Sequence, residues 1–363
     1  MDNKYSIKAV DVFCGAGGLS HGMQKVGIDV VAGYDIEESC RYAFEYNNKA
    51  VFINKDAKLL TGDEVQEFLC GASFTVLAGC APCQPFSTYS RVKQKSGEKD
   101  SRWNLLASFG RLVSEVLPDF VTVENVPGIV SEEIFADFLK LLKDNQYKVD
   151  YRIVYCPDYG MAQTRSRLVL LASKLGTVRL IEPTHKPELY TTVRDVIGHL
   201  PPIVAGEQHA TDALHRASAL SPINLRRIKA SRAGGTWLDW PDELRADCHK
   251  KITGATYPSV YGRMSWDDPA PTITTQCNGF GNGRFGHPEQ DRAISLREAA
   301  MLQSFPENYR FSSPNSKASI ASLAKMIGNA VPVRLGEVVG ESIKLSVDNY
   351  KKLVTDSLPI TSM

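Results

Sequence analysis

DVFCGAGGLS, residues 11–20, is the stretch that decides the fold. It ends an apolar run typical of a strand and opens a helical pattern, with Gly15 and Gly17 in the turn between them. Glycines in such a turn let the backbone approach a ligand, and Asp35, at the end of the next predicted strand, lies where a carboxylate binds ribose hydroxyls. The dinucleotide fingerprint needs a glycine three residues after Gly17, where this chain has Ser20. The turn therefore indicates a nucleotide-like cofactor without saying which one.

Short β-rich runs alternate with helical patterns along the first half of the chain. The predicted strands are 6–13, 28–35, 50–53, 74–79, 119–125 and 149–156, and the predicted helices are 19–27, 37–48, 62–70, 104–117 and 132–145. This order predicts an α/β fold with a doubly wound, mostly parallel sheet and function at the carboxyl ends of its strands. The run 167–173 follows the sixth strand too closely for a helix, so we expect an antiparallel strand at the edge.

The composition is that of an ordinary globular protein, with 43% hydrophobic and 23% charged residues in a chain of 363. No apolar segment is long enough to span a bilayer, so we expect a cytoplasmic protein without a membrane partner. Eight cysteines are too sparse for a disulfide scaffold, and we expect all of them to be reduced.

The sequence pattern changes at about residue 173. Twelve of the nineteen prolines fall between 173 and 314, and the hydrophobic periodicity typical of strands and helices fades there. We predict a catalytic and cofactor-binding domain over 1–172, a smaller irregular domain over 173–294, and a hinge with helices over 295–363 that pack back on the first domain. The aromatic residues expected to form the core of the irregular domain are Trp237, Trp240, Tyr257, Tyr261 and Trp266.

A basic run lies in the irregular domain, although the net charge of the chain is only +1. Between Asp212 and Asp239 there is no acidic residue, while arginine or lysine occurs at 216, 226, 227, 229 and 232. Such a run contacts nucleic acid in some proteins and is a solvated face in many others.

FTVLAGCAPCQPFS, residues 74–87, contains two cysteines at the CxxC spacing after a predicted strand. A structural zinc site is excluded because no second CxxC or matching Cys/His pair exists. A redox pair would make Cys80 the attacking thiol. The third interpretation makes Cys83 a nucleophile toward carbon and leaves Cys80 in the packing at the strand end.

Polar residues also end two other predicted strands. Glu124 follows apolar VTV, where partial burial is expected to raise the pKa of its carboxyl toward a value useful for proton donation, although a turn role for ENVPG explains it equally well. Arg165 and Arg167 are two residues apart, so on an extended segment they share a face and can hold a ring oxygen or a phosphate. Surface arginines are the ordinary alternative.

Six blocks together resemble the ordered signature motifs of the DNA cytosine-5 methyltransferases. They are DVFCGAGGLS, APCQPFS, ENV, QTRSR, REAAMLQSFP at 297–306 and GNAVPV at 328–333. The resemblance covers nearly the whole chain and places the irregular segment where that family has its target recognition domain. It implies a Rossmann-like methyltransferase fold, S-adenosylmethionine as methyl donor, and cytosine C5 in DNA as acceptor.

The resemblance also implies roles for single residues. Cys83 would add to cytosine C6, Glu124 would engage N3 and the amino group, and Arg165 and Arg167 would hold the ring and its O2. The cofactor pocket would be formed by Phe13, Gly15, Gly17, Asp35, Ile36, Asp56, Pro82, Leu105 and Asn329. Departures from the family pattern are Cys14, Cys80 with Ala81, and Asp35 in place of glutamate.

We expect the substrate to be double-stranded DNA with the target cytosine flipped out of the duplex. The predicted DNA contacts are Ser87, Arg226, Arg227, Lys229 and Thr236, and the polar segment 90–102 is expected to close over the base. We expect no metal site, a monomer, and a separately acting restriction endonuclease as a partner. The alternatives are an RNA (tRNA) methyltransferase of the same fold, a CxxC thiol oxidoreductase and an inactive DNA-binding relative; the recognition sequence cannot be read from these residues.

Overall fold

The computed structural model describes residues 5–82, 104–251 and 259–356. The chain forms two compact units: the first contains residues up to 155, 166–183 and 331 onward, and the second contains 156–165 and 184–330. The chain therefore passes between them after residues 155, 165, 183 and 330. The predicted boundaries at 173 and 295 differ from this division, because residues 295–330 belong to the second unit and only the last helix returns to the first.

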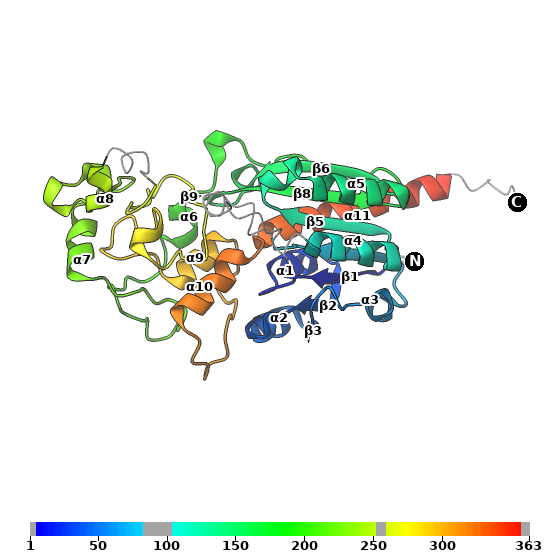
Figure 1. Ribbon diagram of the computed structural model, residues 1–363, viewed down its shortest axis with the longest axis horizontal. Helices are drawn as coiled ribbons and strands as arrows, with labels where there is room; N and C mark the ends of the chain where they lie inside the picture. The colour runs from blue at the N-terminus through cyan, green and yellow to red at the C-terminus, as the bar shows by residue number, and fades with distance from the viewer. Residues whose placement is uncertain (1–4, 83–103, 252–258, 357–363) are drawn as a thin grey trace, which may run out of the picture. The chain divides into compact units, whose positions relative to one another are not determined.

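The first unit is built on a seven-stranded sheet with the order β3-β2-β1-β4-β5-β8-β6 (Figure 1). Its strands are β1 (Ile7–Val12), β2 (Asp29–Asp35), β3 (Val51–Asn54), β4 (Phe74–Gly79), β5 (Phe120–Asn125), β6 (Lys148–Tyr155) and β8 (Ser166–Ser173). The first five pair in parallel, and β8 pairs antiparallel with both β5 and β6. The predicted antiparallel strand is confirmed, but β6 forms the edge and β8 lies between β6 and β5.

Helices cover both faces of this sheet. The helices are α1 (Gly18–Lys25), α2 (Arg41–Asn48), α3 (Gly62–Leu69), α4 (Asn104–Val116), α5 (Glu133–Asp144) and α11 (Val333–Asp356). Val10 and Val12 of β1 point into one apolar cluster with side chains of α3, α4 and α5. Because side chains alternate along a strand, Asp11 points to the opposite face, where Ser20 of α1 bonds to it. The doubly wound α/β prediction is confirmed.

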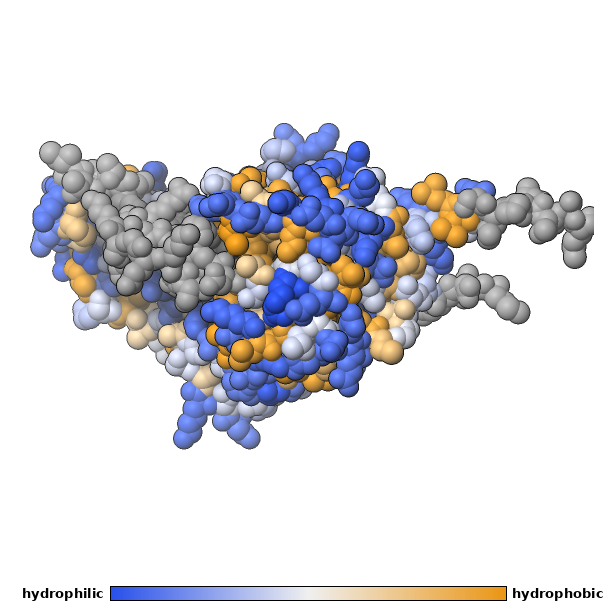
Figure 2. Space-filling model, turned by 45° about the vertical axis from the view of Figure 1, so that its right-hand side comes forward, coloured by the Kyte–Doolittle hydropathy of each residue, from blue (hydrophilic) through white to orange (hydrophobic). Residues whose placement is uncertain are grey.

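The surface turned forward in Figure 2 mixes hydrophilic and hydrophobic residues, as folded proteins ordinarily do. Among the described residues, no helix is both long and apolar enough to cross a membrane.

The second unit has little regular structure. Its elements include β7 (Gln163–Thr164) paired with β9 (Ala270–Pro271), and the helices α6 (Val193–Ile197), α7 (Pro222–Lys229), α8 (Asp247–Lys250), α9 (Leu296–Leu302) and α10 (Ile320–Asn329). Trp237 and Trp240 are buried in its apolar cluster and Tyr261 packs against it, as the sequence predicts. Trp266 instead makes an edge-to-face contact with the ring of His287, and Tyr257 is outside the described residues.

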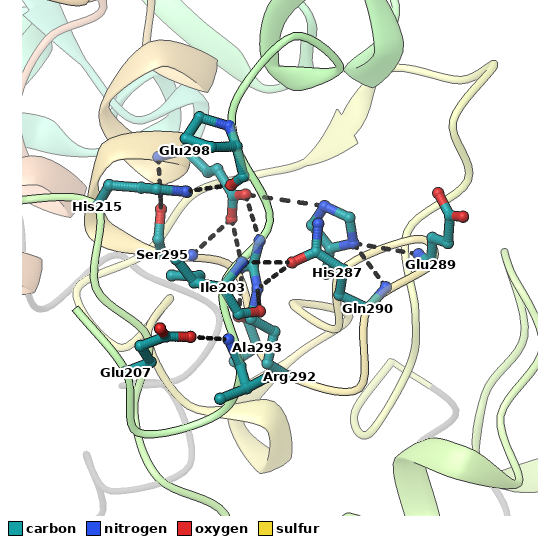
Figure 3. A network of polar contacts seen from close by, with 12 residues as sticks. Ile203, Glu207, His215, His287, Glu289, Gln290, Arg292, Ala293, Ser295 and Glu298 are labelled. Atoms are coloured by element: carbon teal, nitrogen blue, oxygen red, sulfur yellow. Dashed lines mark hydrogen bonds and ion pairs between the residues drawn. The ribbon is translucent and has the colours of Figure 1, made fainter. Parts of the chain in front are cut away.

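A buried polar network explains why residues after 295 stay with the second unit (Figure 3). Arg292 donates from both Nη atoms to the carboxylate of Glu298 at 2.7 Å, and its Nε donates to the carbonyl of Ile203. Ser295, which caps α9, accepts from the backbone N–H of Glu298 and contacts Nδ1 of His215. These bonds tie α9 to segments 203 and 215 of the same unit.

Candidate active site

The glycine turn after β1 has an open side. Phe13 has φ 66°, and Gly15 and Gly17 have φ 49° and 87°, so the backbone is left-handed at three nearby positions. A Cβ added at Gly15 would meet no atom within 4 Å. The space beside Gly15 is therefore open to a ligand that contacts the backbone.

Asp35 links this turn to the end of β2. Its Oδ2 accepts from the backbone N–H of Gly15 at 2.8 Å, and its Oδ1 accepts from that of Glu37 at 2.8 Å. Burial raises the pKa of Asp35 above its ordinary value, while these backbone donors act in the opposite direction. Each carboxylate oxygen keeps a further lone pair that can accept from a hydroxyl.

The side chain of Ile36, next to Asp35, is 69% exposed, which is unusual for an isoleucine and leaves an apolar surface free beside the turn. The open glycine turn, the half-buried carboxylate and this apolar side chain fit a nucleoside-bearing methyl donor.

The surroundings of the other four predicted cofactor residues do not connect them to the glycine turn. Asp56 accepts from the backbone N–H of Lys58 at 2.9 Å, which leaves its second oxygen uncommitted by that bond. Leu105 packs against the core cluster of the first unit, and Pro82 is exposed. Asn329 is exposed at the end of α10 in the second unit. For these four residues the cofactor role stays a prediction.

Glu124 lies at the carboxyl end of β5 with only 5% of its surface exposed. Nε of Arg167 lies 2.9 Å from its Oε1, and Sγ of Cys80 lies 2.8 Å from its Oε2. Oε1 is buried and accepts no hydrogen bond from the described residues, because the N–H of Arg167 is not aligned with it. One carboxylate oxygen thus has a hydrogen-bond donor, while the other has a nearby positive charge and unused hydrogen-bonding capacity.

The sheet register explains why these three side chains meet. Gly79 of β4 is paired with Val123 of β5, so Cys80 emerges beside Glu124. Val169 of β8 is opposite Glu124, and Arg167, two residues away on β8, shares a face with Val169. The carboxyl ends of parallel strands are where α/β sheets ordinarily bind ligands.

Arg165 does not lie on the same strand as Arg167. It belongs to the segment of the second unit between β7 and β8, is 4% exposed, and donates from Nη1 to the carbonyl of Ile273 at 3.0 Å. Each arginine therefore has its own partner, and the prediction that both act on one ring stays a prediction.

Cys83, Ser87 and the segment 90–102 lie outside the described residues. The segment that leads to them is held at its start, because the amide of Asn125 donates to the carbonyl of Ala81 at 3.3 Å. Residues 80 and 81 are thus bonded to residues 124 and 125.

The predicted DNA contacts in the second unit differ in their surroundings. Arg226 and Lys229 are exposed on α7. Arg227 instead donates to the carbonyl of Leu244 at 2.8 Å, and its guanidinium lies over the ring of Trp240. Thr236 caps a short helix by accepting from the backbone N–H of Leu238. Arg226 and Lys229 are thus open to solvent, whereas Arg227 is engaged within the unit, and the DNA contacts stay predictions.

Sequence reasoning missed two polar residues. Cys80 was expected only to pack, whereas its thiol contacts Glu124. Asp11 is buried in β1, and burial raises its pKa to about 7 even though Ser20 donates to it at 2.6 Å. The presence of an aspartate inside the apolar run IKAVDV is the sequence feature that could have indicated the buried Asp11.

The sheet order and this site define an S-adenosylmethionine-dependent methyltransferase of the α/β class. A similar fold occurs in a prophage-encoded Escherichia coli chain named as a DNA modification methyltransferase, with a TM-score of 0.72, 23% identity, and coverage of 94% of this chain and 100% of that chain. The fold is also similar to that of the Dnmt2 methyltransferase of Schizosaccharomyces pombe, with a TM-score of 0.64, 16% identity, and coverage of 95% and 99%.

Residues 7–345 match the family of C-5 cytosine-specific DNA methylases. The chain is 52% identical over 338 residues to the Type II methylase M.HgiDII of Herpetosiphon aurantiacus, covering 92% of this chain and 94% of that protein. The chain belongs to the C-5 cytosine-specific DNA methylase family. It is a DNA (cytosine-5-)-methyltransferase that uses S-adenosylmethionine.

Proposed function

We propose that Cys83 is the nucleophile of this methyltransferase and that Glu124 is the acid beside it. Cytosine C5 is a poor nucleophile, so a thiolate must first add to C6. Glu124 donates a hydrogen bond to N3 and draws electrons from the ring as the thiolate adds. S-adenosylmethionine supplies the electrophilic methyl group. Loss of the C5 proton then expels the thiolate.

The observation that carries this assignment is the half-satisfied carboxylate of Glu124. Its Oε1 is buried without a hydrogen bond from the described residues, which is costly unless a ligand completes it. Arg167 at 2.9 Å supplies positive charge next to that oxygen and next to the ring on which negative charge develops. We assign to Arg165 the role of holding the ring O2, as the family resemblance implies.

For the cofactor, we propose that Gly15 and Gly17 hold the methionine part, that Asp35 binds the ribose hydroxyls, and that Phe13 and Ile36 contact the adenine. The open space beside Gly15 and the exposed Ile36 support this part of the proposal. The remaining pocket positions, Asp56, Pro82, Leu105 and Asn329, rest on the resemblance alone.

We propose that the second unit contains the target recognition region and that exposed basic residues of α7 contact phosphates. The target cytosine is flipped out, because C5 and C6 cannot be reached inside a duplex. We also propose that this methylation protects DNA against a separate endonuclease, a role supported only by the names Type II methylase and Type II methyltransferase of two relatives. That the enzyme is a cytoplasmic monomer rests on the sequence alone.

Duplex DNA with 5-fluorocytosine at the target tests the mechanism. The thiolate should add to C6 and the methyl group should transfer to C5, but fluorine cannot leave as a cation. We expect a covalent complex that requires S-adenosylmethionine, resists denaturant, and carries both DNA and methyl group on the peptide containing Cys83.

Cys83→Ala should form no complex while still binding the cofactor. Mass spectrometry that finds no adduct, under conditions where unmodified DNA is methylated, would show that addition to C6 by Cys83 is wrong. An adduct on fluorinated RNA in preference to DNA would favour the RNA alternative.

A further inference from the structure

The contact between Cys80 and Glu124 is specific in its geometry. Sγ of Cys80 donates to Oε2 of Glu124 at 2.8 Å, which is short for a thiol. The backbone N–H of Cys80 donates to the carbonyl of Val12 at 3.3 Å, so the residue is held on the end of β1 as well. The thiol therefore has a fixed position relative to the carboxylate.

This contact differs from ordinary packing of a cysteine. A packed thiol lies among apolar atoms, whereas this one lies against a carboxylate that is 5% exposed. A buried carboxylate oxygen without a donor is costly, and the thiol, although a weak donor, removes that cost at Oε2. Among the described residues, no group of three or more histidine, cysteine, aspartate or glutamate side chains could hold a metal ion here.

The two oxygens of Glu124 are consequently unequal. Oε2 accepts from Cys80, while Oε1 lies 2.9 Å from Nε of Arg167 and accepts no hydrogen bond from the described residues. A carboxyl group without these contacts could turn about its Cγ–Cδ bond, which would change the direction in which its free oxygen points. The thiol on one side and the guanidinium on the other hold the plane of the carboxyl group in one orientation.

We propose that Cys80 is a positioning residue for the methyl transfer, which acts by holding Oε2 of Glu124 so that Oε1 is the oxygen that engages the target base. This inference rests on the proposed function, because it requires Glu124 to contact the cytosine. Cys80 makes no contact with the reacting atoms in this scheme. It lowers the conformational freedom of the acid before the substrate arrives.

Replacement of the thiol tests the proposal. In Cys80→Ala the donor is lost, and we expect the single-turnover methylation rate at saturating DNA and S-adenosylmethionine to fall about tenfold, the upper end of the net worth of one hydrogen bond. The KM values for both substrates should stay within about twofold, because neither substrate touches Cys80. Cys80→Ser, which keeps a donor, should restore most of the rate.

A double-mutant cycle separates positioning from general damage. In a Glu124→Gln background, Cys80→Ala should cause little further loss, since the carboxylate that the thiol positions is gone. Cys70→Ala is the matched control, because Cys70 is exposed at the end of α3, and it should behave as the unchanged protein. If the alanine variant unfolds, Cys80→Val fills the volume without a donor and serves in its place.

The proposal fails if the unchanged protein methylates DNA and Cys80→Ala does so at the same rate. It also fails if the serine variant is as slow as the alanine variant, or if the loss persists in the Glu124→Gln background. Absence of the 5-fluorocytosine adduct in the unchanged protein would instead overturn the proposed function itself, and the inference with it.

Discussion

At the scale of single residues, Asp11 shows how burial changes a charge. Its carboxyl is 1% exposed, Oδ1 has no hydrogen-bond partner in the part of the chain that the structure describes, and burial raises its pKa to about 7. In the unfolded chain the group ionises near its ordinary pKa of 3.8. Between these two values the folded state binds a proton that the unfolded state does not. The contribution of Asp11 to stability is therefore lost as the pH rises toward 7.

Asp11→Asn should remove this dependence. Relative to the unchanged protein, we expect the variant to gain about 2.5 kcal/mol of unfolding free energy between about pH 5 and about pH 8. Urea unfolding of both proteins at the two pH values measures the change. An equal difference at both values would mean that Asp11 titrates as an ordinary aspartate.

The neighbouring arginines of α7 offer a second contrast at this scale. Arg226 is exposed, whereas Arg227 is bonded to Leu244 and lies over Trp240. Arg226→Gln or Lys229→Gln should lower the salt slope of DNA binding by about one unit for every sequence. Arg227→Gln should instead lower the unfolding free energy by about 1–2 kcal/mol.

Salt titrations of DNA binding and urea unfolding distinguish the two roles. An unchanged slope in Arg226→Gln would make the basic run a solvated face. A folded, fully stable Arg227→Gln with weakened DNA binding would reverse the assignment.

At the scale of elements, the sequence predicted the strands of the first unit to within a few residues, because each carries a local apolar run. It did not predict β7 and β9, which have two residues each and pair across more than a hundred positions. Nor did it predict the placement of α9, which depends on the bond between Arg292 and Glu298. Likewise, the contact of Cys80 with Glu124 follows from the register of β4 and β5, which no local pattern contains.

The close packing of α1 against α11 gives a prediction at this scale. A Cβ added at Gly22 would overlap the carbonyl oxygen of Val333 and lie 2.6 Å from the backbone nitrogen of Glu337. Backbone atoms cannot move aside as a flexible side chain can, so Gly22→Ala should cost about 2 kcal/mol or more in spite of the better helix propensity of alanine.

Gly110→Ala in α4 is the control. Its Cβ would meet the side chain of Leu141 at 3.2 Å, which can shift by a few tenths of an ångström. We expect it to stay within about 1 kcal/mol of the unchanged protein in urea unfolding. Equal losses in the two variants would show that the α1–α11 contact is looser than it looks.

At the scale of the whole molecule, one buried group in each unit responds to acid in the opposite direction from the other. Asp11 adds stability to the first unit as it takes up a proton below about pH 7. The second contains His287, whose pKa burial lowers from 6.5 to about 4, and whose Nδ1 accepts backbone bonds from Glu289 and Gln290 (Figure 3). Burial alone would raise the pKa of Glu298, but the bonds from Arg292 more than offset it and lower that pKa.

Both groups of the second unit make it sensitive to acid. His287 stays neutral in the folded state, while the unfolded state protonates below 6.5, so stability falls as the pH drops from 6.5 toward 4. Glu298 adds stability above its unfolded pKa, and that contribution is lost as the pH falls through its lowered folded value. We therefore expect the second unit to unfold before the first at about pH 4.5.

Two spectroscopic signals can follow the units separately. Three of the four tryptophans, Trp237, Trp240 and Trp266, lie in the second unit, so in a Trp103→Phe background tryptophan fluorescence reports on that unit, while helices of the first unit contribute to far-ultraviolet circular dichroism. At about pH 8 the two urea transitions should lie close together, and at about pH 4.5 the fluorescence transition should come first.

His287→Asn should weaken the pH dependence of the fluorescence transition by about one proton, because the asparagine oxygen can accept in place of Nδ1 but cannot be protonated. His199→Gln, at an exposed histidine, should leave it unchanged. Coincident transitions at both pH values, or an unaltered pH dependence in His287→Asn, would mean that the buried network of Arg292, Glu298 and His287 does not govern the acid stability of the second unit.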